Sequence, residues 1–360
     1  MNPVIESLLP LEDKLKFVSI SSDYDSIITN LKLDPNTDDV AQIDWHNQLL
    51  NPRETCDATT RWLFTVSSLN FCFWQLDNTA YCVQYNNQLY SGYWALCAAI
   101  ALGQSLGIDL TNAEYVNSDH FTIDELKLCF PDFNNRPVPL LKRRFEILKE
   151  SSSTIVNKFG GSIVNLTDSV DSAIQLVKEV VRSFDSFKDE CDVNVQSDIK
   201  RAMVRNKSNC SSNQNNEQNN QQNKEQMHLK FYKRAQIFVA ELYHTNPKRY
   251  GFKDLDQLTL FADYRIPQML HRFGLIQYKP ELIAILQDKQ HLMESGSYLE
   301  CEIRAASILA VYRLAQKTGI KQITVDFLLW NKFKEIQAGS TESYFGGIEV
   351  GMHRVVGWFY

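Results

Sequence analysis

The sequence predicts a mainly α protein, one compact helical domain over residues 1–360 with a small β-hairpin. Apolar residues recur at helical spacing along most of the chain, and one short segment alternates as strands do. The composition breaks only once, at residues 206–226. Because the apolar character is the same on both sides of this break, we favour one domain with an insertion over two domains.

The predicted helices carry local start and stop signals. Residues 92–107 are apolar nearly all round, which is typical of a central buried helix. Thr122 and Glu125 form a capping-box pattern, and Gly160-Gly161 ends a helix over residues 139–158. Thr167 is expected to cap a helix with apolar positions at 174–181. Further helices are expected over residues 229–243, 280–286, 298–318 and 324–336.

Two segments depart from the helical pattern. In residues 80–90, Tyr81, Val83 and Tyr85 alternate before Asn86-Asn87, which predicts a hairpin. Residues 206–226 are rich in Asn, Gln and Ser and contain no aliphatic or aromatic side chain. Such a segment buries too little surface to offset its ordering entropy, so we expect a disordered surface insertion.

The charge balance limits the partners. Lys and Arg total 37 against 43 for Asp and Glu, a net charge of −6, whereas proteins that grip long nucleic acids are usually basic. Residues 1–17 lack a leader pattern, and the strongly apolar run 94–102 is too short for a membrane span. We therefore expect a soluble protein of the cytoplasm, and also of the nucleus, with no nucleic-acid polymer and no membrane as partner.

General catalytic motifs are missing from the sequence. It contains no Walker phosphate loop, no G-x-G-x-x-G fingerprint, no G-x-S-x-G elbow and no C-x-x-C or H-x-x-x-H metal pair. The eight cysteines are best explained as small buried hydrophobes in a reducing compartment. We expect no metal.

Four segments hold more functional side chains than a core needs. Asn70, Phe73 and Trp74 lie among aromatics at 69–74 and 90–94, either as bulky core or as a slot that stacks a planar base. Lys233 and Arg234 open an apolar helix, either as solvent-facing charges or as a monophosphate clamp, with Lys233 a point charge and Arg234 a fork.

The other two segments contain acids. Asp263, between Phe261 and Ile266, is either a structural ion-pair partner of Arg265 or a poised carboxylate of the kind that glycosidic cleavage needs. Glu300 and Arg304 are i,i+4 partners. On the last predicted helix, Asp326 shares a face with Trp330, and Phe327 shares a face with Asn331. An acid beside aromatics at this spacing could hold a heterocycle, or Asp326 could be an ordinary acid at the start of a helix.

Several strings, in order along nearly the whole chain, resemble the queuosine salvage proteins. They are Leu69-Asn70-Phe71, Phe73-Trp74, Tyr90-Ser91-Gly92-Tyr93-Trp94, Phe159-Gly160-Gly161-Ser162, residues 231–236, 261–265 and 267–268, Glu302-Ile303-Arg304 and the final residues 353–360. The resemblance implies hydrolysis of queuosine 5′-phosphate to queuine and ribose 5-phosphate without metal or other cofactor. It also implies a fold similar to helix-hairpin-helix DNA glycosylases.

The resemblance also implies roles for residues. Asp263 falls at the catalytic aspartate of the Phe-Ala-Asp-Tyr-Arg string, and Phe261 and Asp326 fall where base contacts are expected. Gln48 and Asn331 stand where the family often has a histidine and an acid, so these positions lose charge here. The candidate substrate-binding residues are Phe261, Asp326, Phe327, Asn331, Gln48, Asn70, Phe73, Trp74, Lys233, Arg234 and Tyr264.

Three classes of function are compared. An N-glycosylase acting on a free nucleotide fits the acidic charge and comes first. A base-excision glycosylase on DNA or RNA would need a basic groove and a base-flipping wedge, and no dense Lys/Arg stripe is present. A non-catalytic queuine or nucleobase carrier would bind the base without releasing it from the nucleotide.

Overall fold

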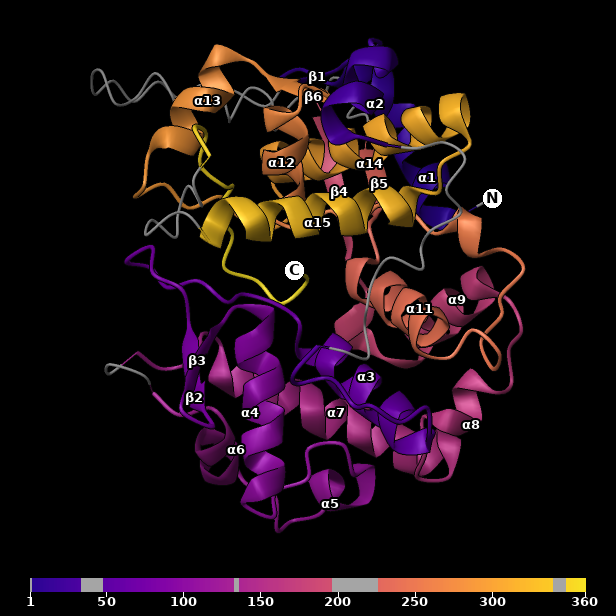
Figure 1. The fold of residues 1–360 in the computed structure, drawn as a ribbon, viewed down its shortest axis with the longest axis vertical. Coiled ribbons are helices and arrows are strands. Elements are labelled where there is room, and N and C mark those ends of the chain that lie inside the picture. The colour runs from indigo at the N-terminus through magenta and orange to yellow at the C-terminus, as the bar shows by residue number, and fades with distance from the viewer. Residues whose placement is uncertain (1, 34–47, 133–135, 196–225, 339–347) are drawn as a thin grey trace, which may run out of the picture.

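The computed structural model describes residues 2–33, 48–132, 136–195, 226–338 and 348–360. The chain is mainly helical, as predicted, and Figure 1 shows its helices in two groups. The upper group contains α1 (Pro3–Leu8), α2 (Tyr24–Leu31), α12 (Ile266–Arg272), α13 (Pro280–Gln287), α14 (Tyr298–Thr318) and α15 (Gln322–Ala338). The lower group contains α3 (Asp57–Leu69), α4 (Tyr93–Ser105), α5 (Ala113–Asn117), α6 (Ile123–Cys129), α7 (Leu141–Phe159), α8 (Val164–Thr167), α9 (Ala173–Ser183) and α11 (Lys233–Thr245). Short 3₁₀ turns cover Leu9–Lys14, Asp185–Phe187 and Leu255–Gln257.

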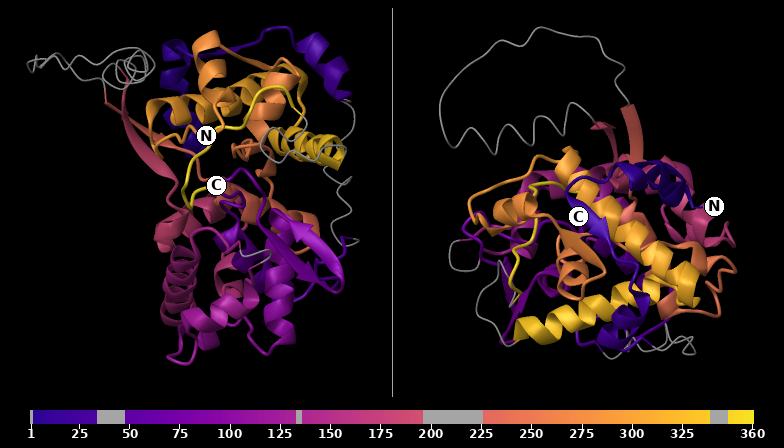
Figure 2. Two further views of the ribbon diagram at one scale, coloured as in Figure 1. Left: turned by 90° about the vertical axis from the view of Figure 1, so that its left-hand side faces the viewer. Right: turned by 90° about the horizontal axis from the view of Figure 1, so that it is seen from above.

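The strands of the described residues form three two-stranded antiparallel sheets. The predicted hairpin is confirmed as β2 (Cys82–Tyr85) and β3 (Gln88–Ser91), with Asn86 and Asn87 at positive φ in the turn. Two further pairs were not predicted: β1 (Val18–Ile20) with β6 (Ile276–Tyr278), and β4 (Glu190–Asn194) with β5 (Gln226–Lys230). Figure 2 shows the β4·β5 strand pair rising along the upper group.

A buried carboxylate attaches the N-terminal segment to α14. Glu302 Oε1 accepts hydrogen bonds from the backbone N–H groups of Lys16, Phe17 and Val18, at 2.6, 2.5 and 2.9 Å. Burial raises the pKa of Glu302, and these three donors act against that shift. The first and last thirds of the chain therefore share the upper group.

The helix boundaries follow the local signals in most places. The capping box of Thr122 and Glu125 is confirmed, and α7 ends at Gly160, which has a left-handed φ of 58°. Thr167 was wrong as a cap for residues 174–181, because it ends the short helix α8 and Ser172 caps α9 instead. The Ser172 hydroxyl accepts the backbone N–H of Gln175.

The predicted helix over residues 229–243 starts too early. Residues 226–230 pair as β5 with residues 190–194, and α11 begins at Lys233 after Tyr232, whose φ is 53°. The predicted insertion at 206–226 lies outside the described residues except for Gln226, the first residue of β5. No helix in the described part of the chain has the length and apolarity needed to cross a membrane.

The C-terminal residues connect the two groups of helices. Tyr360 is buried, and its backbone oxygen accepts a hydrogen bond from the Cys72 N–H, just beyond α3. Figures 1 and 2 show this end of the chain in the middle of the molecule. The buried hydrophobic residues form one cluster that includes helices of both groups. The candidate site lies where these groups face each other.

Candidate active site

Asp263 lies between the segment 258–262 and the start of α12. Its Oδ1 accepts the backbone N–H groups of Arg265 and Ile266 at 2.6 and 2.8 Å. These two donors at the start of a helix hold the side chain in one orientation, at a position that favours negative charge. The suggested link between Asp263 and Arg265 therefore runs through the main chain of Arg265, while the Arg265 guanidinium donates to Gln268 Oε1 at 3.0 Å.

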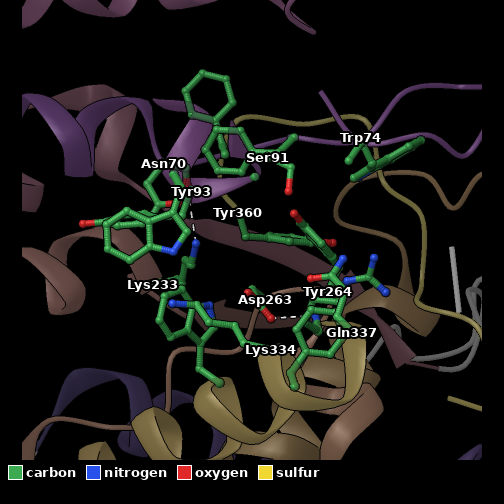
Figure 3. Close-up of a pocket in the computed structure, with 18 residues that line it drawn as sticks. Asn70, Trp74, Ser91, Tyr93, Lys233, Asp263, Tyr264, Lys334, Gln337 and Tyr360 are labelled. Carbon is green, nitrogen blue, oxygen red and sulfur yellow. Dashed lines mark hydrogen bonds between the residues drawn. The ribbon is translucent and has the colours of Figure 1, made fainter. Parts of the chain in front are cut away.

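Two adjoining chambers meet at Asp263. The Phe261 chamber, of about 230 Å³, takes its name from Phe261, which lines it, and the Tyr264 chamber, of about 490 Å³, takes its name from Tyr264. Figure 3 shows the Asp263 carboxylate at the centre of the pocket, between Lys233 and Tyr264. Both chambers are lined by Asn70, Tyr93, Trp94, Lys233, Asp263, Trp330 and Lys334.

The Phe261 chamber has aromatic walls and an acid. The rings of Phe261 and Phe327 are edge-to-face, with centroids 6.1 Å apart. Asp326 is buried beside them, and its Oδ1 accepts the Phe261 N–H at 2.8 Å. Burial raises the pKa of Asp326 well above its usual value. Gln48 and Asn331 also line this chamber, as exposed side chains.

Lys233 is a buried cation at the junction of the chambers. Its Nζ donates to the Asn70 carbonyl at 3.3 Å, and burial lowers the Lys233 pKa to about 8 although the negative charge of Asp263 opposes that shift. Of the two alternatives for Lys233, the solvent-facing charge is wrong, because only 5% of the residue's surface is exposed. A buried ammonium in the same pocket as Asp263 places a positive charge near that side chain.

A buried ion pair beneath the site connects Lys233 to the segment that carries Asp263. The guanidinium of Arg304 pairs with Asp189, at 2.5 and 2.9 Å, and with Glu300 at 3.2 Å, as the i,i+4 spacing predicted for the latter. Arg304 Nε donates to the Ala262 carbonyl at 3.1 Å, and Asp189 Oδ2 accepts the Lys233 backbone N–H at 3.3 Å. This ion pair therefore fixes both backbone positions relative to each other.

The Tyr264 chamber collects the other aromatic candidates. Phe73, Trp74 and Tyr264 line it together with Asn70. Trp74 is packed under the guanidinium of Arg354, 4.8 Å from the ring centroid, so its orientation is fixed. Burial raises the pKa of Tyr264, so its hydroxyl stays protonated and able to donate a hydrogen bond.

Arg234 is the candidate that the structure does not bring to the chambers. It is buried outside both chambers, where its Nη groups donate to the backbone carbonyls of Ser67, Ser68 and Ser186. Neither chamber is lined by it. The expectation of a phosphate fork at Arg234 is corrected, because its donors hold the end of α3 instead.

Sequence reasoning missed two charged residues of the site. Glu241 lines the Phe261 chamber two helical turns after Lys233, and Lys334 lines both chambers, with its Nζ 3.2 Å from the Trp330 ring centroid. Each follows a recognised residue at helical spacing: Lys233, Ile237 and Glu241 step by four, as do Trp330 and Lys334. That spacing is the signal that could have found them.

This arrangement suits chemistry on a nucleotide. One carboxylate lines two adjoining chambers, the smaller with aromatic and acidic walls and the larger with both aromatic and polar walls. A fixed anion there would stabilise positive charge that develops on a bound sugar. Among the described residues, no group of three or more His, Cys, Asp or Glu side chains could hold a metal ion. The fold and the pocket define a mainly helical protein with a pocket centred on a carboxylate.

Comparison with known proteins identifies the family. Residues 50–204 and 213–360 match the queuosine salvage protein family, so this chain belongs to that family. A Bos taurus protein named queuosine 5′-phosphate N-glycosylase/hydrolase is 34% identical over 299 residues, 78% of each chain. Proteins of the same name from Mus musculus and Schizosaccharomyces pombe are 32% and 30% identical, covering 79% of both chains for the first, and 82% of this chain and 80% of the relative for the second.

Proposed function

We propose that this protein hydrolyses the N-glycosidic bond of queuosine 5′-phosphate and releases queuine for reuse in tRNA modification. Membership of the queuosine salvage family and the shared name of its relatives support this activity. One structural observation carries the proposal: Asp263 lines both chambers. A nucleotide with its base in one chamber and its ribose phosphate in the other has its glycosidic bond beside that carboxylate.

The base occupies the Phe261 chamber in this proposal. Phe261 and Phe327 offer apolar faces to a planar ring, and the Asp326 carboxyl offers an acceptor to the donors of a guanine-type edge. Gln48 and Asn331 add neutral hydrogen-bonding groups. The ribose 5-phosphate then lies in the Tyr264 chamber, against Asn70, Phe73, Trp74 and Tyr264, with Lys233 as the proposed phosphate contact.

Asp263 provides the catalytic charge. As the C1′–N bond breaks, the bonding electrons leave with the base and positive charge develops on the ribose. The ionised Asp263 carboxylate stabilises that charge more in the transition state than in the ground state. Water supplies the hydroxyl that ends on C1′ and the proton that ends on the base, so the products are queuine and ribose 5-phosphate.

The proposal includes several broader expectations. The chain acts as a single N-glycosylase domain interrupted at residues 206–226, with an architecture similar to helix-hairpin-helix DNA glycosylases. Its substrate is a free nucleotide and not a nucleic-acid polymer, which the net charge of −6 supports. We propose the cytoplasm, and also the nucleus, as its location.

The test is direct release of the base. Purified protein is incubated with queuosine 5′-phosphate, with the nucleoside queuosine, and with tRNA that contains queuosine, and free queuine is followed by mass spectrometry. We expect release from the 5′-phosphate and none from tRNA. Release from tRNA would favour a base-excision activity, and tight binding of queuine without release from any substrate would favour a carrier.

A further inference from the structure

Glu241 is a buried acid of the Phe261 chamber to which the reaction described above gives no role. Lys233, Ile237 and Glu241 lie on one face of α11 and all line this chamber. Glu241 is 8% exposed, and its Oε1 accepts the Tyr93 hydroxyl at 3.2 Å. Its other carboxylate oxygen, Oε2, is buried and has no hydrogen-bond partner among the described residues.

A buried carboxylate oxygen without a donor is costly, and native proteins rarely leave one unexplained. Burial raises the Glu241 pKa to about 7, and the hydrogen bond from Tyr93 and the charge of Lys233 only partly offset this shift. Neither lysine ammonium that lines the chamber forms a hydrogen bond with Glu241: Lys233 donates to the Asn70 carbonyl, and Lys334 lies on the Trp330 ring. A donor on a molecule that enters the chamber would supply the partner that Oε2 lacks among the described residues.

The proposed substrate carries a suitable donor. Queuosine is a 7-deazaguanosine whose 7-substituent contains a secondary amine, which is largely protonated at neutral pH. Three acids line the Phe261 chamber: Asp263 at the junction, Asp326 committed to the Phe261 N–H, and Glu241. Of these, Glu241 alone has a buried oxygen without a partner.

We propose that Glu241 is a specificity-determining residue that binds the secondary ammonium of the base substituent. This inference rests on the proposed function and extends it to substrate specificity. It explains how the site distinguishes queuine from guanine-type bases that lack the amine-bearing substituent. The charge of the bound ammonium compensates the buried carboxylate, while Tyr93 holds the other carboxylate oxygen.

The test compares two free bases by calorimetry: queuine, which is cationic, and 7-cyano-7-deazaguanine, which is neutral. The wild-type protein should prefer queuine by roughly 10- to 100-fold, the range expected for a charge-assisted hydrogen bond. Glu241→Gln keeps the shape and an oxygen for Tyr93 but removes the charge. It should abolish the preference and leave affinity for the neutral base within about twofold.

A matched control removes the same charge outside the chambers. Glu335 is exposed on α15 beside Lys334, and Glu335→Gln should keep the full preference for queuine. If Glu241→Gln weakens both bases equally or weakens neither, Glu241 does not read the ammonium and the inference fails. Because binding of free base is measured, this failure is distinct from failure of the proposed function, which would appear as absence of queuine release from the nucleotide.

Discussion

The Asp326 carboxylate accepts a 2.8 Å hydrogen bond from the Phe261 backbone N–H. This bond joins the first turns of α15 to the segment that leads into Asp263. The next residue of α15, Phe327, packs edge-to-face on the Phe261 ring. One end of one helix therefore positions both an aromatic wall of the Phe261 chamber and the backbone just before the proposed catalytic carboxylate.

Asp326→Asn separates the structural and the binding parts of this contact. The amide oxygen of Asn can still accept the Phe261 N–H, but the second carboxylate oxygen becomes an NH₂ donor facing donors of the base. We expect a melting temperature within a few degrees of wild type and queuine affinity reduced by roughly 1–3 kcal/mol. Calorimetry and thermal unfolding on one preparation test this. Unchanged affinity would place the edge of the base elsewhere.

Phe261→Leu keeps bulk but removes the planar face. We expect queuine binding to weaken by roughly 1–3 kcal/mol, as for other lost base–aromatic stacks. Trp74→Leu is the comparison, because Trp74 lines only the Tyr264 chamber and should affect the free base much less. A larger loss in Trp74→Leu than in Phe261→Leu would reverse our assignment of the chambers.

Arg234→Met tests the corrected role of Arg234. The variant leaves the Ser67, Ser68 and Ser186 carbonyls without their buried donor, so we expect a loss of roughly 2–4 kcal/mol in the free energy of unfolding. The ratio of activity on queuosine 5′-phosphate to activity on the nucleoside should stay the same. A selective loss on the 5′-phosphate, with unchanged stability, would restore the idea of a phosphate fork.

Lys233→Met should stabilise the protein. The folded pKa of Lys233 is about 8, below its usual 10.5, so below pH 8 the folded state carries a buried ammonium at a cost of roughly 3 kcal/mol. Between pH 8 and 10.5 the folded protein loses this proton while the unfolded chain keeps it, and wild-type stability rises relative to the variant. The gain from Lys233→Met should thus be largest below pH 8, as measured by urea unfolding across pH.

The same variant tests the phosphate contact. Lys233→Met should reduce activity on queuosine 5′-phosphate more than activity on queuosine, because only the nucleotide offers a phosphate to pair with. An equal loss on both substrates would assign Lys233 to holding Asp263. A gain in stability that does not change with pH would show that its ammonium is not the source of the cost.

Local signals predicted the elements that are determined locally. The Thr122–Glu125 capping box and the Asn86-Asn87 turn are set by neighbouring residues, and the helix over residues 298–318 was predicted with the bounds that it has. The strand β5 pairs instead with residues 190–194, and the sequence between them gives no sign of that pairing. The helix predicted from apolar periodicity therefore began at residue 229, whereas α11 begins at Lys233.

The site was predictable where residue type alone indicates chemistry. An acid among apolar residues drew attention to Asp263, and clustered aromatics drew attention to Trp74. Which way a charged helix residue points depends on tertiary packing, so Lys233 and Arg234 could not be separated although they are adjacent. Glu241 was missed for the same reason, since an acid in an amphipathic helix usually faces solvent.

The central claim is that the Asp263 charge drives bond cleavage, and turnover of Asp263→Asn tests it most directly. Asn keeps the shape and one oxygen for the Arg265 and Ile266 N–H groups. We predict a folded protein with nearly normal queuine affinity and a barrier raised by roughly 3–5 kcal/mol, a loss of about a hundred- to several-thousand-fold in queuine release from queuosine 5′-phosphate. Near-normal turnover by the folded variant would contradict the account.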